Sequence, residues 1–289
     1  MLPLVRYGVH VHNFGPYADP RRLVELAREA EAAGWDGFFV CDHLTASWDG
    51  RPQPIADPWI ALSAIALATE RVLIGPMVAA LPRRRPWQLA SETVTLDHLS
   101  GGRLVLGVGL GTLDSQNFAP FDEEPDLAAR GRMLDESLEV LTGLWRGQPL
   151  THEGERYHVR AATFLPTPHG RARPPIWVAG SWPHRRPFRR AARWDGVFVD
   201  VEGVDWMRDQ MMSPADLRAA VDYTLAHRSS AEPFEVVIGG HSPANRAEAA
   251  DRLAPYVEAG LTWWVEGVHP AFGSVEELRA RVRQGPPQR

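Results

Sequence analysis

Short hydrophobic runs alternate along the chain with longer segments in which hydrophobic and polar residues follow a helical period. The short runs are bounded by glycine, proline or polar residues, which is typical of strands buried on both faces. The longer segments place hydrophobic residues three and four positions apart, which predicts helices that pack one face against a sheet. The predicted strands are 7–12, 37–41, 72–78, 104–109, 176–179, 196–199, 235–239 and 262–266. The predicted helices are 20–33, 58–68, 86–100, 130–145, one that begins soon after residue 181, 214–227, 245–259 and 274–282.

The segment 86–111 shows this pattern most clearly. Pro86 suits the first turn of a helix, because its missing N–H would have no partner there. Gly101 and Gly102 then end the helix, and the run LVLGVG that follows has the length of a buried strand. Three glycines line the exit of this strand, at Gly107, Gly109 and Gly111. Because glycine has no Cβ, we expect a ligand to approach the backbone closely at this exit.

Eight strands that alternate with helices in 289 residues predict one α/β domain, a (β/α)8 TIM barrel over residues 1–283. A long polar loop is expected over 42–57. Stretches without clear periodicity predict insertions at 112–129, after the fourth strand, and at 147–175, before the fifth, where weak alternation predicts a small hairpin. Residues 284–289 are expected to form a disordered tail. No G-x-G-x-x-G turn follows the first strand, which argues against a doubly wound sheet.

Charge and composition narrow the range of partners and reactions. The net charge of −5 is spread without long runs, which argues against a nucleic-acid-binding surface. The chain has no run of about 18 apolar residues that would predict a membrane span. Its first residues lack the layout of a signal peptide, so we expect a cytoplasmic protein.

There is no lysine, which excludes Schiff-base and P-loop lysine chemistry and leaves arginine and backbone amides to hold anions. The single cysteine excludes a disulfide within the chain and any multi-cysteine metal site.

Polar residues gather where predicted strands end, which is where the active sites of such barrels lie. In the first strand, His10 and His12 point to the same side, because side chains alternate along a strand. We expect His12, nearer the mouth, to contact a ligand and His10 to line the pocket floor. A catalytic metal needs about three protein ligands, and beyond these two histidines only Asp200 and His241 are distant candidates, so we expect no metal. We expect Cys41 to be buried and to serve in packing. A metal-dependent hydrolase that uses the two histidines remains the less favoured alternative.

Asp42 and His43 directly follow the second strand. A carboxylate beside an imidazole suits proton transfer, because histidine titrates near neutrality and the carboxylate can raise its pKa. In the alternative interpretation, Asp42 only caps the loop that follows. We favour a catalytic site formed by His43, Asp42 and His12.

The exit of the fifth strand suits an anion. Gly180 and Ser181 are followed by a predicted helix N-terminus, where free N–H groups and the helix dipole favour phosphate. Arg185 or the arginine after it can add positive charge, although an exposed basic helix start would give the same sequence. An aromatic wall suited to a flat ring ligand is expected from the tryptophans in or beside the mouth segments, which are Trp48, Trp177 and Trp182.

Four stretches of the chain carry a resemblance to a known family. They are AREAEAAGWDGFFVCDHL, DPWIALSAIALATERVLIGPMV, PWQLASETVTLDHLSGGRLVLGVGLG and PPIWVAGSWP. In this order they resemble the bacterial luciferase-like family of flavin- and deazaflavin-dependent oxidoreductases. The resemblance implies a (β/α)8 barrel that binds FMN or the deazaflavin coenzyme F420 in its mouth, and a homodimer formed through the second and third helices. It implies hydride or electron exchange with a small organic substrate, in some members as a monooxygenase that uses O2.

The resemblance also implies roles for particular residues. Asp42 and His43 match an acidic–histidine pair that lies against the ring, with His43 as proton donor or base. Met77 and Val78 match a bulge in the third strand, where the family has a non-proline cis peptide behind the ring. Gly107, Gly109 and Gly111 match the strand-four glycines of the family. Gly180 and Ser181 match its phosphate-binding turn.

Two positions depart from the family pattern. Thr112 stands where some sugar-phosphate dehydrogenase members carry a glutamate, which argues against that reaction. The usual glycine pair after the fifth strand is replaced by Gly180-Ser181-Trp182. The Asp42–His43 pair favours F420 slightly over FMN. A non-catalytic relative that only binds the cofactor remains the alternative to an enzyme.

Overall fold

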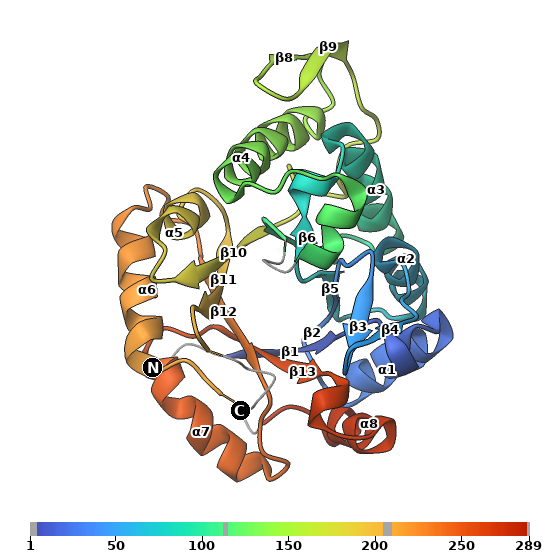
Figure 1. Ribbon diagram of the computed structural model, residues 1–289, viewed down its shortest axis with the longest axis vertical. Helices are drawn as coiled ribbons and strands as arrows, with labels where there is room; N and C mark the ends of the chain where they lie inside the picture. The colour runs from blue at the N-terminus through green and yellow to red at the C-terminus, as the bar shows by residue number, and fades with distance from the viewer. Residues whose placement is uncertain (1–4, 112–114, 205–209, 288–289) are drawn as a thin grey trace.

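The computed structural model describes residues 5–111, 115–204 and 210–287, and a parallel barrel forms its centre (Figure 1). One sheet runs in the order β5-β2-β1-β13-β12-β11-β10-β7-β6, and all neighbouring strands in it are parallel. A bridge between Ile74 and Leu104 brings β5 beside the start of β7 and closes the ring. The strands are β1 (Arg6–Val11), β2 (Gly37–Val40), β5 (Leu73–Pro76), β6 (Ala79–Ala80), β7 (Leu106–Gly109), β10 (Ile176–Trp182), β11 (Gly196–Val201), β12 (Glu235–Gly240) and β13 (Trp263–Val268). β5 lies within the predicted strand 72–78 and β6 follows it closely, so the two count as one strand of the barrel and the predicted (β/α)8 barrel is confirmed.

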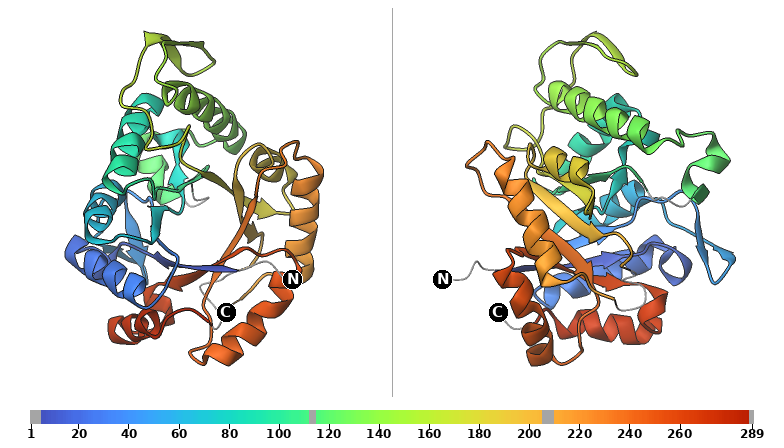
Figure 2. Two further views of the ribbon diagram at one scale, coloured as in Figure 1. Left: turned by 180° about the vertical axis from the view of Figure 1, so that it is seen from behind. Right: turned by 60° about the vertical axis from the view of Figure 1, so that its left-hand side comes forward.

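Helices cover the outside of the barrel, as the front and back views show (Figures 1 and 2). They are α1 (Pro20–Ala32), α2 (Pro58–Ala68), α3 (Pro86–Leu99), α4 (Leu127–Leu144), α5 (Arg185–Ala191), α6 (Pro214–Ala226), α7 (Arg246–Glu258) and α8 (Val275–Gln284). Most begin after a side chain that accepts a hydrogen bond from a first-turn N–H, at Asp19, Asp57, Asp126, Ser213, Asn245 and Ser274. α4 begins three residues earlier than predicted, because Asp126 Oδ2 accepts from the Ala129 N–H at 2.7 Å. None of the helices in the described ranges is long and apolar enough to span a membrane.

Additional short elements lie between the barrel units. The predicted loop 42–57 contains a small hairpin, β3 (Ala46–Trp48) with β4 (Arg51–Gln53). A second hairpin, β8 (Leu150–Glu153) with β9 (His158–Ala162), stands out from the barrel in both views of Figure 2. Short 3-10 helices occur at Gly15–Tyr17, Leu81–Arg83, Ser115–Asn117, Ala119–Phe121 and Pro270–Phe272.

The chain is still packed where the sequence predicts the start of a disordered tail. Gln284 is the last residue of α8, and the three residues that follow it are buried. The carbonyl of Pro286 accepts a hydrogen bond from Arg246 Nε at 2.9 Å. Residues 288–289 lie outside the described part of the chain.

The inside of the barrel is closed at one end by large aromatic side chains. Trp177 and Trp263 lie near the starts of β10 and β13, and their ring centroids are 5.3 Å apart. Phe39 of β2 completes the layer, 5.7 Å from the Trp177 ring. All three side chains are almost fully buried. Trp177 therefore forms part of the floor and not the expected wall of the mouth.

Two of the strand-four glycines are required by the neighbouring strand. A Cβ on Gly107 would lie 2.4 Å from the carbonyl oxygen of Pro76, and one on Gly109 would lie 2.9 Å from Val78 Cγ2. The peptide bond between Met77 and Val78 is cis, in agreement with the resemblance. The absence of a Cβ at these glycines thus makes room for residues 76–78 of the neighbouring strand. The expected contact of these glycines with a ligand stays a prediction.

Candidate active site

A pocket lies at the carboxyl ends of β11, β12, β13 and β1. Its lining is mainly apolar, with Phe198, Met211 and Ile238 among the side chains, and its polar groups include His10 and Asp200. Partial burial raises the pKa of the Asp200 carboxyl above its ordinary value. A largely apolar wall with few polar groups is typical of sites for cofactors and small substrates.

His10 of β1 and His12, which directly follows this strand, point into the barrel mouth. Val9 and Val11 pack outward in the core beneath the helices, so the alternation directs His10 and His12 inward, as predicted. His10 pairs in register with Phe39 of β2, and the residue two positions later on that side is Cys41. The Cys41 thiol lies 3.2 Å from His10 Nε2 and 3.4 Å from His12 Nδ1. Cys41 is buried as predicted, but it faces the histidines directly.

Two further histidines join this group. The ring of His12 lies 4.9 Å from the ring of His10 and 4.6 Å from that of His269, which directly follows β13. His269 Nδ1 accepts a hydrogen bond from the Ala271 N–H at 3.0 Å. His43 lies near enough that its positive charge would lower the pKa of His10 and His12. The sequence prediction overlooked His269, although its place immediately after the last barrel strand was a signal for it.

Burial controls the charge of these rings. It lowers the pKa of His10 and of His269 to about 4, and it holds the pKa of His12 well below its ordinary value. The three imidazoles are therefore neutral near pH 7. Each can then offer one nitrogen lone pair and one N–H to a ligand or to a neighbour. Trp48 stands beside this group, as predicted, with its ring 4.7 Å from that of His269.

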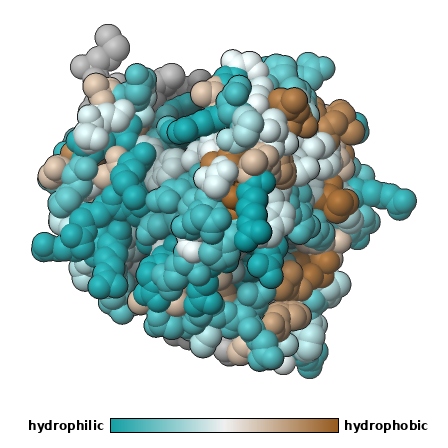
Figure 3. Space-filling view, turned by 90° about the horizontal axis from the view of Figure 1, so that it is seen from above, coloured by the Kyte–Doolittle hydropathy of each residue, from teal (hydrophilic) through white to brown (hydrophobic). Residues whose placement is uncertain are grey.

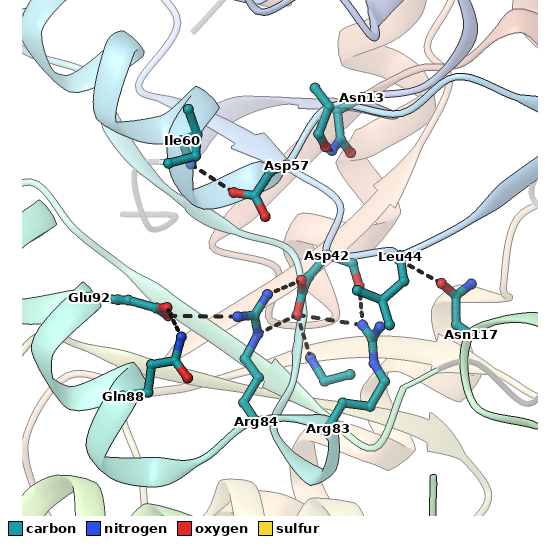
Figure 4. Close-up of polar contacts among 12 residues, drawn as sticks. Asn13, Asp42, Leu44, Asp57, Ile60, Arg83, Arg84, Gln88, Glu92 and Asn117 are labelled. Atoms are coloured by element: carbon teal, nitrogen blue, oxygen red, sulfur yellow. Dashed lines mark hydrogen bonds and ion pairs between the residues drawn. The ribbon is translucent and has the colours of Figure 1, made fainter. Parts of the chain in front are cut away.

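The carboxylate of Asp42 is part of a buried ion pair (Figure 4). Arg84 donates to Asp42 Oδ1 at 2.5 Å and to Oδ2 at 3.0 Å, and the Ala80 N–H donates to Oδ2 at 3.1 Å. Arg83 donates to the Asp42 carbonyl at 2.5 Å. The carboxylate ties the end of β2 to the segment that follows β6. The predicted catalytic role of Asp42 beside His43 stays a prediction.

The residues before and after His43 in the sequence are fixed by hydrogen bonds to other parts of the chain. Asp42 precedes His43, and the N–H groups of Leu44 and Thr45 both donate to Asn117 Oδ1, at 2.7 and 3.0 Å (Figure 4). Asn117 is fully buried. The backbone on either side of His43 is thus fixed to other parts of the barrel, which places the imidazole at the mouth on a rigid support.

The predicted phosphate turn after the fifth strand has a different structure. β10 continues to Trp182, because Ser181 and Trp182 pair in register with Asp200 and Val201 of β11. Gly180 and Ser181 are therefore strand residues, not turn residues. A Cβ on Gly180 would lie 2.7 Å from Cβ of Pro187, so this glycine lets α5 pack closely on the strand.

The side chains of Trp182 and Arg185 contact helices on the outside of the barrel. The Trp182 ring lies 5.4 Å from that of Phe188 and 6.0 Å from that of Tyr223. The Arg185 guanidinium lies 5.1 Å from the centre of the Tyr223 ring. A phosphate-binding role for this region stays a prediction, and the described contacts do not bring it together with the histidines.

The glycine at the end of the strand-four exit is also enclosed by protein. Gly111 has a φ of +86°, and a Cβ there would lie 2.3 Å from the ring of Phe118. Thr112, which departs from the family pattern, lies outside the described residues.

Comparison with protein families gives a match to the luciferase-like monooxygenases over residues 5–283. The F420-dependent glucose-6-phosphate dehydrogenase of Nakamurella multipartita is 36% identical over 207 residues, which are 70% of this chain and 57% of that enzyme. The enzyme of the same name from Beutenbergia cavernae is 39% identical over 188 residues, 64% of this chain and 53% of the relative. The matched part thus covers little more than half the length of these relatives.

Solved structures show the same fold at lower sequence identity. The F420-dependent tetrahydromethanopterin reductase of Methanopyrus kandleri superposes with a TM-score of 0.74 at 17% identity and covers 97% of each chain. The FMN-bound oxygenating component of 3,6-diketocamphane monooxygenase from Pseudomonas putida gives 0.76 at 15% identity, over 98% of this chain and 97% of the other. At these identities the likeness concerns the fold alone.

Proposed function

This chain belongs to the luciferase-like monooxygenase family, and from that membership we propose that it is an oxidoreductase that transfers hydride between coenzyme F420 and a small organic substrate. The observation that carries the choice of cofactor is the identity of 36–39% to relatives that are named F420-dependent. FMN, with or without O2 as co-substrate, is the alternative within the same family.

The barrel mouth fits a flat ring. Its pocket has a mostly apolar lining, and the aromatic floor of Phe39, Trp177 and Trp263 closes the barrel at its other end. Val78 lies next to the strand-four glycines Gly107 and Gly109. F420, when bound here, would supply the hydride acceptor or donor.

The residues of the chain would supply proton transfer and exclusion of water. In the oxidation of an alcohol, the carbon-bound hydrogen leaves as hydride, and the proton of the hydroxyl group must pass to a base. We assign that proton to a ring nitrogen of His43, because a neutral imidazole can accept a proton and this one stands on a fixed backbone. The buried aromatic floor limits the entry of water to the open end of the barrel.

The substrate is a small organic molecule in this proposal, and glucose 6-phosphate is not assigned. Thr112 stands where the resemblance implies a glutamate in sugar-phosphate dehydrogenases. The chain also spans only part of the length of the relatives that bear that name.

Equilibrium binding of the purified protein to F420 and to FMN tests the cofactor assignment. We expect binding of F420 in the micromolar range and much weaker binding of FMN. Micromolar binding of FMN without binding of F420 would reverse the assignment. Binding of F420 without turnover of any compound in a broad panel of alcohols and carbonyl compounds would instead favour a non-catalytic cofactor-binding protein.

We also propose that the protein forms a homodimer through α2 and α3. The sequence of α2, PWIALSAIALA, is apolar on every face except for Ser63, although the helix lies on the outside of the barrel. Ile60 and Leu67 on it are 69% and 73% exposed. Hydrophobic residues gather on the right-hand side of Figure 3, which is the side of α2 in Figure 1. A helix without a polar face is typical of one that is covered on all sides.

Replacing both Ile60 and Leu67 with arginine is expected to convert the dimer to a monomer, because two charges would have to be buried in the interface. Light scattering after gel filtration measures the change as a fall in mass to that of one chain. Leu165→Arg, at a residue 74% exposed and outside α2 and α3, is the matched control and should leave the mass unchanged. A wild-type protein that is monomeric at micromolar concentration would contradict the proposal.

A further inference from the structure

We propose that His10, His12 and Cys41 form a binding site for one divalent transition-metal ion, with zinc as the best match. The three side chains come from β1 and from the residue after β2, and their ligand atoms all lie within 4.8 Å of one another. The proposal does not rest on the proposed function, because it concerns binding of the ion in the absence of any organic cofactor.

The distances agree with those of a metal site. Zinc binds a thiolate at about 2.3 Å and an imidazole at about 2.0–2.1 Å, so a tetrahedral site separates the sulfur from each nitrogen by roughly 3.5 Å. The Cys41 thiol lies 3.2 Å from His10 Nε2 and 3.4 Å from His12 Nδ1. These two edges need movements of a few tenths of an ångström, and the two ring nitrogens, which lie within 4.8 Å of each other, would have to be about 3.3 Å apart around the ion.

The supporting structure is rigid on both sides of the site. β1 and β2 are neighbouring parallel strands in register, and the His12 N–H continues the β1 pairing by donating to the carbonyl of Val268 at 3.1 Å. His10 also makes a hydrogen bond with the backbone of Met77. A second hydrogen bond of this kind fixes the ring orientation and tautomer of many metal-binding histidines.

The donor set selects the kind of ion. One sulfur and two imidazole nitrogens suit zinc and other late first-row metals, and they are poor ligands for magnesium or calcium. Burial keeps His10 and His12 neutral near pH 7, so their lone pairs need no deprotonation. Cys41 must lose its thiol proton to bind the ion. This deprotonation costs free energy, because burial and the charge of Asp42 raise the pKa of the thiol.

The site has three protein ligands and adjoins open space. His10 is also part of the lining of the mouth pocket, so a water molecule or a hydroxyl or carbonyl oxygen of a small molecule can reach the ion. Three protein ligands with one exchangeable position are typical of catalytic zinc, whereas structural zinc has four. The sequence alone did not predict this site, because Cys41 looked like packing and left the histidine pair without a third ligand.

Cobalt(II) titration of the chelator-treated protein tests the proposal. We expect about one ion per chain, with d–d bands of a tetrahedral site and a thiolate-to-cobalt charge-transfer band. The chain has one cysteine, so a thiolate band identifies Cys41 without ambiguity. Titration to saturation without that band, or no binding at micromolar cobalt and zinc, would overturn the proposal in favour of a thiol hydrogen-bonded to the two histidines.

Two variants and a control make the test specific. Cys41→Ser is expected to abolish the charge-transfer band, and both Cys41→Ser and His12→Asn are expected to weaken zinc binding at least tenfold. His158→Asn, at an exposed histidine of the outer hairpin, should bind as the wild type does. Equal loss in the control would place the ion on the surface and reject the site. Zinc should raise the melting temperature of the wild type but not of Cys41→Ser, which separates loss of the ion from loss of the fold.

Discussion

Replacing His43 with alanine is expected to lower turnover about 100- to 10,000-fold, because a positioned general acid or base contributes this much to a proton-transfer step. Cofactor binding should stay close to that of the wild type, since the pocket wall is formed mainly by other side chains. Steady-state reduction of F420 with a substrate that the wild type uses gives the turnover, and equilibrium titration of the same variant gives the cofactor affinity.

The control for this variant is His98→Ala, which removes an exposed histidine on α3 far along the chain from the mouth residues. It should retain both turnover and binding. A His43→Ala enzyme with near-normal turnover would show that another group moves the proton, and Asp200 would be the next candidate because burial raises its pKa. Loss of cofactor binding together with turnover would make His43 a binding residue.

Asp42→Asn is expected to lower the free energy of unfolding by about 3–5 kcal/mol, the usual cost of removing one partner of a buried ion pair. The Asp42 side chain is 1% exposed, and those of Arg84 and Arg83 are 19% and 4% exposed. The neutral amide would leave the Arg84 guanidinium with the more distant Glu92 carboxylate, 3.7 Å away, as its counter-charge, in a place that water reaches poorly. Urea unfolding of the two proteins, followed by circular dichroism, measures the difference.

A surface ion pair provides the comparison for Asp42. Glu155→Gln removes a carboxylate 3.4 Å from Arg132, with both side chains more than half exposed, and should cost less than about 1 kcal/mol. If Asp42→Asn costs no more than Glu155→Gln, the ion pair with Arg84 does not hold the loop, and the earlier interpretation of Asp42 as a partner of His43 regains support.

The barrel could be predicted from the sequence because the position of each strand and helix depends on residues that are close together in the chain. Each strand is a short hydrophobic run, and each helix has its own spacing and cap, so strand and helix positions follow from a few neighbouring residues. The errors lie where pairing between distant segments decides the outcome. β10 extends to Trp182 because β11 continues beside it, although Gly180, Ser181 and Trp182 carry no clear strand pattern.

The site was predicted less completely, for the same reason. The alternation of β1 correctly placed His10 and His12 on one side, but the partners of a side chain come from other strands. Asp42 pairs with Arg84, which lies 42 positions later in a run of arginines that looks exposed in the sequence. Cys41 could have been assigned to the inside, since Phe39 two positions before it faces inward.

The barrel joins the beginning of the chain to its end. β1 lies between β2 and β13, and His12 beside β1 meets His269 beside β13 with their rings 4.6 Å apart. During synthesis, the edge of β1 that pairs with β13 in the barrel stays unpaired until the residues of β13 have left the ribosome. The histidine group is therefore completed only when the ring is sealed, and a nascent or cleaved chain that lacks β13 carries an open sheet in which His12 has no neighbour at the place of His269.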